Sequence, residues 1–196
     1  MRTITTGPVA AGFAKASSLH RRRRGFTLLE LSVGLTIFLL GVLGYARTML
    51  SLEHAQRRNK EASRATEAAR AILERIDAEA FPEAFRRYNR VTSDDPGGTG
   101  TAPGAHFDVP GLAARADDAD GLPGEVVFPV HPSNAGMLWE GLDDARLGMP
   151  CFLNADADQA DLVSTDYQIL PVLVRVEWTG PGGPGRVELA TVVGNW

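Results

Sequence analysis

The chain has 196 residues, of which 44% are hydrophobic, so it is long enough for one folded domain with an additional segment. Its net charge of -4 is unevenly distributed, because residues 1–25 contain Arg and Lys but no acid, whereas residues 91–196 are strongly acidic. An acidic distal part repels phosphates, which argues against nucleic acid as its partner. The single cysteine, Cys151, excludes an internal disulfide, and we expect it to be a small buried apolar residue.

Residues 26–52 are the first predicted element, a membrane-spanning helix. Residues 31–46 carry no charge, and with residues 26–29 they reach the length that spans a bilayer, interrupted only by Glu30. Because the basic residues precede this segment, the positive-inside rule places residues 1–25 in the cytoplasm and the chain from residue 53 onward outside. A secretory signal has a shorter apolar core and a small-residue cleavage site after it, and neither is present here.

The start of this segment carries a specific motif, "RRRRGFTLLELSVGLTIFLL", residues 21–40. It resembles the amino-terminus of the type IV prepilin family, which includes the pseudopilins of type II secretion. The shared features are a basic patch, a glycine, an aromatic residue and a glutamate five residues after the glycine. In this chain they are Arg21, Arg22, Arg23, Arg24, Gly25, Phe26 and Glu30.

The resemblance implies processing and assembly. A membrane-embedded prepilin peptidase would cut between Gly25 and Phe26, and the new amino group of Phe26 would be N-methylated. The product would polymerise through its apolar helix with other pilins or pseudopilins in a helical filament, on an inner-membrane assembly platform. It would first lie in the inner membrane as a single-pass protein with a periplasmic or extracellular head.

Glu30 is expected to take part in assembly. An acid inside a membrane helix costs about 2.5–3.5 kcal/mol on insertion scales unless it is paired. Cleavage would create a positive amine at Phe26, and in a filament Glu30 of one subunit can meet the amine of a neighbour. In an uncleaved anchor, Glu30 would instead extend toward the cytoplasmic interface.

Residues 53–90 are predicted to continue the helix with an amphipathic surface. Alanine, isoleucine and leucine recur there at steps of three and four residues, from Ala55 to Ala80, which indicates one buried stripe. The charged residues between them, Glu61 among these, are expected to form a solvated face. No proline occurs between Gly25 and Pro82, so the helix is expected to be continuous until Phe81 and to kink, end or restart at Pro82.

The remaining chain is predicted to be a loop, residues 91–124, and a β-rich head, residues 125–196. Residues 125–130 have the pattern of a strand, and residues 137–142 are ambiguous. Val172, Val174, Val176 and Trp178 alternate with Leu173, Arg175 and Glu177, as in a half-buried strand, and a Gly-Pro-rich turn leads to a second strand. The expected fold class is therefore α+β, with the long amino-terminal helix packed on a small antiparallel sheet.

Three acidic clusters in this part are candidate calcium ligands, because calcium prefers oxygen donors in loops. Asp94 and Asp95 form the first cluster. The other two comprise Asp117, Asp118, Asp120, Asp156, Asp158 and Asp161. Their spacing does not match an EF-hand, so solvated acidic loops are the alternative, and we expect no other cofactor.

Catalytic motifs are missing from the sequence. His20, His54, His106 and His131 show no metal-ligand spacing, and no serine lies in a G-x-S-x-G pattern. We therefore expect a structural subunit, a minor pilin or minor pseudopilin, rather than an enzyme. Two alternatives remain: an uncleaved single-pass protein whose outer domain binds a ligand or cation, and a secreted enzyme that begins beyond Leu40.

Overall fold

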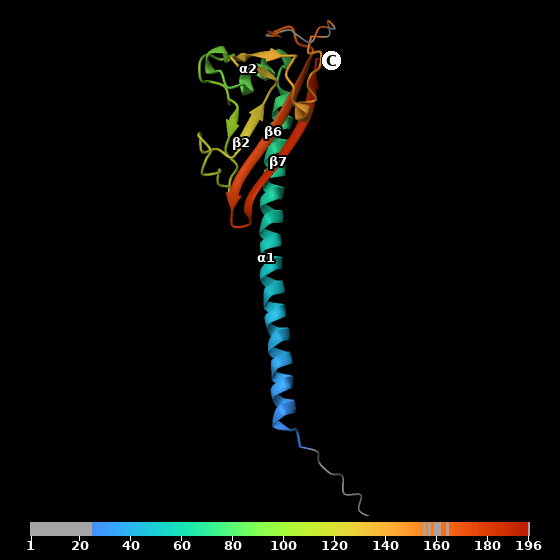
Figure 1. Ribbon diagram of the computed structural model, residues 1–196. Helices are drawn as coiled ribbons and strands as arrows, with labels where there is room; N and C mark the ends of the chain where they lie inside the picture. The colour runs from blue at the N-terminus through green and yellow to red at the C-terminus, as the bar shows by residue number, and fades with distance from the viewer. Residues whose placement is uncertain (1–24, 155, 157, 159–161, 164, 196) are drawn as a thin grey trace, which may run out of the picture. The chain divides into compact units, whose positions relative to one another are not determined.

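The computed structural model describes residues 25–154, 156, 158, 162–163 and 165–195. The chain divides into two compact units, one ending at Ala46 and the other running from Arg47 to Trp196. The described part is α+β, as predicted, with a helix α1 (Leu28–Ala78), a short helix α2 (Phe81–Tyr88) and two antiparallel sheets (Figure 1). The leader arginines at positions 21–24 and His20 lie outside the described residues.

The larger sheet has four strands in the order β1-β2-β6-β7. Its strands are β1 (His106–Phe107), β2 (Gly124–Val127), β6 (Ile169–Gly180) and β7 (Gly183–Gly194). The smaller sheet has the order β3-β4-β5, with β3 (Val130–His131), β4 (Asn134–Trp139) and β5 (Leu162–Val163). Two short 3-10 helices, η1 (Thr92–Asp94) and η2 (Ala145–Leu147), lie in the connections.

Helix α1 ends earlier than the sequence pattern predicts. Ala80 is extended, with φ -60° and ψ 123°, and α2 then begins at Phe81 with Pro82 in its first turn. In a continuous helix, the ring of Pro82 would clash with the carbonyl of Ala78, whereas its fixed φ suits a new first turn. The restart at Pro82 is therefore confirmed, and the expected continuity as far as Phe81 is wrong.

The β-rich head packs on one stripe of the second half of α1. The buried residues of α1 are Glu61, Ala65, Ala69, Ile72 and Ile76. The predicted stripe is thus confirmed over its centre, whereas Ala55 and Ala80 at its two ends are exposed. The assignment of Glu61 to a solvated face is wrong, because this side chain is buried against the large sheet.

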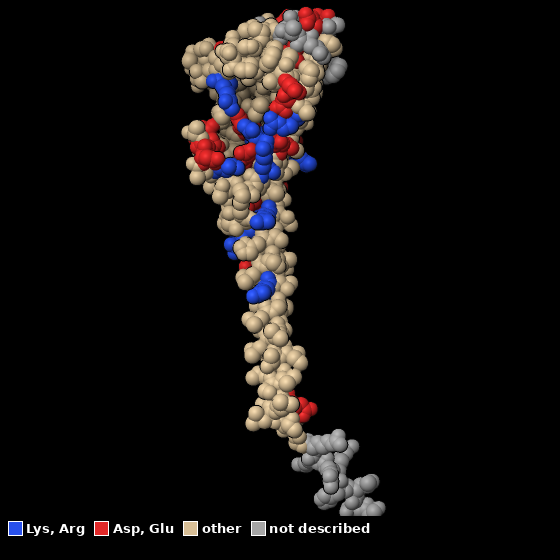
Figure 2. All heavy atoms as spheres, viewed as in Figure 1, with Lys and Arg blue, Asp and Glu red and all other residues tan. Residues whose placement is uncertain are grey.

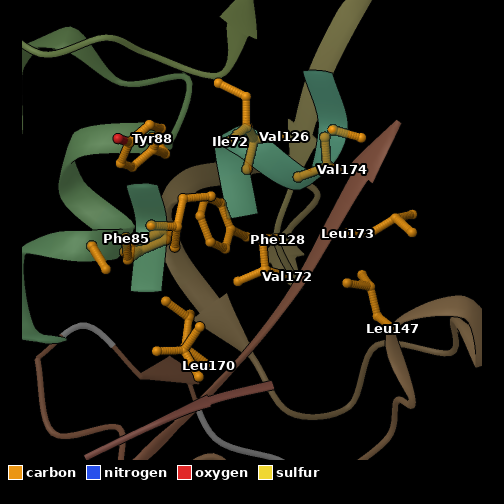
Figure 3. Close-up of a cluster of buried hydrophobic side chains, with 14 of the residues drawn as sticks. Ile72, Phe85, Tyr88, Val126, Phe128, Leu147, Leu170, Val172, Leu173 and Val174 are labelled. Carbon is orange, nitrogen blue, oxygen red and sulfur yellow. The ribbon is translucent and has the colours of Figure 1, made fainter. Parts of the chain in front are cut away.

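The long hairpin of β6 and β7 forms the middle and one edge of the large sheet. Val172 and Val174 lie on the side of β6 that faces Phe85, whereas Leu173 lies on the other side with Leu147 (Figure 3). Both faces of β6 are therefore buried here, because the segment that contains η2 covers the outer face. The predicted hairpin is confirmed, but β6 is more deeply buried than a half-buried strand.

Two segments contain more regular structure than their sequence indicates. Within residues 91–124, where a loop is expected, η1 forms, and β1 pairs with β2. His131 lies in β3, where its ring contacts Trp139 with the ring centroids 5.3 Å apart. The ambiguous segment around Trp139 is β4.

Candidate assembly and processing site

The start of α1 is held by its own side chains. Gly25, Phe26 and Thr27 precede the helix in non-helical backbone, and the side chain of Phe26 is exposed. The hydroxyl of Thr27 accepts a hydrogen bond from the N–H of Glu30, at 3.2 Å, and its carbonyl accepts one from the N–H of Leu31, at 3.1 Å. Thr27 is therefore the N-cap, which leaves the Gly25–Phe26 bond in accessible, non-helical chain.

Glu30 lies in the first turn of α1, where a negative charge is favoured by the exposed N–H groups of the helix. Thr27 and Glu30 have the T-x-x-E spacing of a capping box, in which the two residues support one helix start. A role for Glu30 was predicted from the sequence, whereas the capping role of Thr27 was not. The spacing itself was the signal that could have revealed the cap.

The first part of α1 is apolar on every side. Among the described helices, α1 alone is long and apolar enough to cross a membrane, and its apolar segment is not buried. A Cβ placed on Gly34, Gly41 or Gly44 would meet no neighbouring atom within 4 Å. The Ser32 and Thr36 hydroxyls donate to carbonyls of their own helix, so they need no outside partner.

A second contact set fixes the tip of the β6–β7 hairpin to α1. The Glu61 carboxylate accepts from the indole N–H of Trp178 at 3.2 Å and from the N–H of Gly182 at 3.3 Å. The guanidinium of Arg58 donates to the carbonyl of Gly182. A Cβ at Gly180 would lie 2.6 Å from a Glu61 carboxylate oxygen, so this turn needs glycine to approach the helix. We call these residues the hairpin clasp.

A polar hollow of about 660 Å³ lies in the head between β2, β6 and the segment before β2. Glu125 forms ion pairs with both Arg90 and Arg175 in this hollow, and His106 contacts Asp120. Side chains of both charge signs gather on the face of the head shown in Figure 2. The hollow is therefore lined by paired charges rather than by a set of free carboxylates.

The acidic residues proposed as calcium ligands have other partners in the structure. Hydrogen bonds from Arg115 hold the pKa of Asp117 below its usual value. The backbone N–H of Leu122 does the same for Asp120, and Asp118 accepts from the N–H of Asp120.

The other two acidic clusters are likewise occupied by local hydrogen bonds. Asp156 and Asp158 take part in turns that start at Asn154. In the first cluster, Asp94 accepts from the Asn89 amide and Asp95 from the N–H of Ala102. Within the described residues, no group of three or more His, Cys, Asp or Glu side chains could hold a metal ion, and Asp161 lies outside them.

The burial of Glu140 was not recognised from the sequence, and the predicted burial of Cys151 was overestimated. Glu140 is fully buried, and one of its carboxylate oxygens accepts from the N–H groups of Leu153 and Asn154. Cys151 is only half-buried rather than fully buried, and burial raises the pKa of its thiol. Its sulfur lies 3.1 Å from that of Met149, so it acts as a packing residue.

The comparison with family models agrees with the geometry at the start of α1. Residues 20–46 match the model described as the prokaryotic N-terminal methylation motif. The chain carries the amino-terminal segment of a type IV pilin-like protein. No curated protein and no solved structure matches it.

The matched motif covers both the expected cleavage position and the helix start. Gly25, Phe26 and Glu30 all lie within the matched residues, as does the basic patch at positions 21–24. The match ends at Ala46, the last residue of the first compact unit. Together with the apolar helix, the motif indicates membrane anchoring of this pilin-like chain.

Proposed function

We propose that this chain is a structural subunit, a minor pilin or minor pseudopilin, of a type IV pilus-like or type II secretion filament. The observation that carries the proposal is the methylation motif continuing directly into an exposed apolar helix. A side chain that is exposed and apolar needs lipid or another apolar helix around it. Such a helix can serve in turn as a membrane anchor and as the core of a filament.

Processing by a prepilin peptidase would separate Gly25 from Phe26. In support, both residues lie in non-helical chain just before the cap at Thr27, so a peptidase can reach the bond without unwinding α1. The cut removes the basic leader and leaves the helix start intact. The new amine, N-methylated, would be a cation at the end of an apolar helix and would need an anion.

Glu30 would supply that anion in a neighbouring subunit. Its position in the first turn is favourable within its own helix, but in lipid the carboxylate would still lack a counter-charge. Pairing it with the amine of the adjacent subunit removes both unpaired charges at once and sets the axial register of the two helices. The lipid bilayer, the peptidase and an inner-membrane assembly platform are the other partners of the subunit.

The orientation follows from the basic leader. Residues 1–25 would remain in the cytoplasm, the apolar helix would cross the inner membrane once, and the head would lie in the periplasm or outside the cell. The head would then leave the membrane as part of the filament. No enzymatic role is proposed.

Intact-mass and amino-terminal analysis of the chain purified from its native membrane tests the processing. We expect the mature chain to begin at Phe26 and to carry one added methyl group on its amine. A Gly25→Arg variant should retain Met1 and remain in the membrane, whereas Gly41→Ala, a matched change in the apolar helix, should be processed normally. A parent chain that still begins at Met1 would refute the proposed function.

The alternative of an uncleaved membrane protein with a ligand-binding outer domain draws support from the polar hollow of about 660 Å³ in the head. It predicts an intact amino-terminus and membrane residence with no filament-associated fraction. The same mass measurement therefore separates the two functions.

A further inference from the structure

The polar hollow of the head has no part in the filament role proposed above. Its volume of about 660 Å³ lies within the range of about 300–1,000 Å³ that is typical of small-molecule sites. Among the described residues, its apolar lining is limited to Ala119, Leu122 and Pro123, and the other lining side chains are ionisable. Such a lining favours a polar ligand over a lipid or an aromatic molecule.

One group of lining residues has a surplus of positive charge. Glu125, on β2, forms ion pairs with both Arg90 and Arg175, so two guanidinium groups share one carboxylate. Each guanidinium donates to Glu125 through one nitrogen, and no other hydrogen bond from either is found within the described chain. Because a guanidinium has five N–H donors, most of the donors of Arg90 and Arg175 remain for water or a ligand.

Two further ion pairs at the hollow compensate their own charges. Arg115 pairs with Asp117 at 3.0 Å. Glu177 pairs at 3.2 Å with Arg186, which itself lies outside the lining. These four side chains therefore contribute equal numbers of positive and negative charges, and the surplus at Arg90 and Arg175 is not cancelled by them.

The segment before β2 supplies a surplus of negative charge to the same hollow. Asp118 lines the hollow and is half-buried, and within the described chain no cationic side chain pairs with it. Its contact there is the backbone N–H of Asp120, at a long 3.4 Å. His106 contacts the carboxylate of Asp120, so a charge on this imidazole would offset Asp120 but not Asp118. The hollow therefore contains one uncompensated carboxylate as well as the uncompensated guanidinium charge.

We propose that the hollow binds a small zwitterion, a polar molecule with one carboxylate and one ammonium group, such as an amino acid or a short peptide. The ligand carboxylate accepts hydrogen bonds from Arg90 and Arg175, and the ligand ammonium donates to Asp118. Hydrogen bonds between two charged groups are stronger than those between neutral groups, and planar guanidinium groups match the geometry of a carboxylate. This inference goes beyond the filament role, because it concerns the head alone.

Ligands of a single charge sign fit this hollow less well. An anion would accept hydrogen bonds from the arginines, but Asp118 and the acidic sequence of residues 91–196 would repel it. An organic cation would pair with Asp118 but would be repelled by Arg90 and Arg175. A metal ion lacks ligands, since no group of three or more His, Cys, Asp or Glu side chains among the described residues could hold one. A zwitterion compensates both surplus charges at once.

Equilibrium dialysis of the full chain in detergent tests the proposal with radiolabelled glycine and triglycine as probes. Each probe is also used in two blocked forms, one acetylated at its amine and one amidated at its carboxyl, so that each blocked form keeps a single charge. The unblocked probe should bind at least about tenfold more tightly than either blocked form, because each block removes a hydrogen-bonded contact between charged groups. The ratio of the affinities for glycine and triglycine distinguishes an amino acid from a peptide as the ligand.

Two variants assign the two ends of the ligand. Arg90→Gln should weaken binding of the unblocked probe at least about tenfold and leave binding of the amidated form unchanged. Asp118→Asn should weaken binding of the unblocked probe equally and leave the acetylated form unchanged. Arg90 is exposed and Asp118 half-buried, so neither change should unfold the head. Arg146→Gln is the matched control, because Arg146 is an exposed arginine that also pairs with two acids, Asp144 and Glu188, outside the hollow.

The outcomes separate this inference from the proposed function. Absence of binding of both glycine and triglycine overturns the zwitterion site. An acetylated form that binds as tightly as the unblocked probe would show a simple anion site, an equally tight amidated form would show a simple cation site, and either result overturns the proposal. Equal weakening by Arg90→Gln and Arg146→Gln does the same. A chain that begins at Phe26 and binds neither probe overturns this inference alone, whereas an unprocessed chain that binds a probe supports it and refutes the filament role.

Discussion

The hairpin clasp should be a large contributor to the stability of the head, and a Glu61→Ala substitution tests this. The change removes the acceptor of two buried donors, the Trp178 indole N–H and the Gly182 backbone N–H. Each buried donor left without a partner costs about 1–3 kcal/mol. No water can easily replace the carboxylate, since Glu61 is 8% exposed and Trp178 is 4% exposed. We therefore expect a loss of about 3 kcal/mol in the free energy of unfolding.

Thermal unfolding of the full chain in detergent, followed by tryptophan fluorescence, measures this loss. For a chain of this size, about 3 kcal/mol lowers the Tm by roughly 6–12 °C. Glu67→Ala is the control, because Glu67 is an exposed acid on the same helix, and its loss should change the Tm by less than about 2 °C. If Glu61→Ala unfolds at the temperature of the control, the clasp does not stabilise the head and the reasoning fails.

Three further outcomes are expected. Gly182→Ala should destabilise the head by about 1–3 kcal/mol in chemical denaturation, because a Cβ there would lie 2.7 Å from the Arg58 side chain. Gly136→Ala is the control and should be neutral, because the atom nearest to an added Cβ there lies 3.5 Å away. Hydrogen bonds from Arg146 lower the pKa of Asp144. This carboxylate therefore stabilises the fold at a pH above its unfolded pKa, and the stabilisation is lost as the pH falls through its folded pKa. Asp144→Asn should flatten the acid limb of a curve of Tm against pH, and an unchanged limb would contradict this. Since burial raises the pKa of Cys151, its alkylation in the native chain should require a higher pH than in the unfolded chain, and identical pH profiles by mass spectrometry would show that the thiol is not shielded.

The amino-terminal half of this protein could be predicted from sequence because its structure depends on residues that are close together in the chain. A run of apolar residues specifies a helix that needs lipid or other helices, and a glycine and a glutamate at fixed distances mark its start. The cap at Thr27 is equally local, and its spacing to Glu30 predicts it. The structure of the head was harder to predict from sequence where contacts join distant parts of the chain. Glu61 looks like a member of a charged solvated face until Trp178 and Gly182, more than 100 residues later, are brought against it.

The sequence by itself determined the apolar helix, the methylation motif, the stripe on α1 and the β6–β7 hairpin, since each follows from periodicity or from neighbours within a few residues. Only the tertiary structure decided that Leu173 is covered by Leu147, that Glu125 lies between two arginines, and that β7 ends the sheet. Strand order and the burial of a charge depend on which remote segments pack together, and no local pattern encodes that choice.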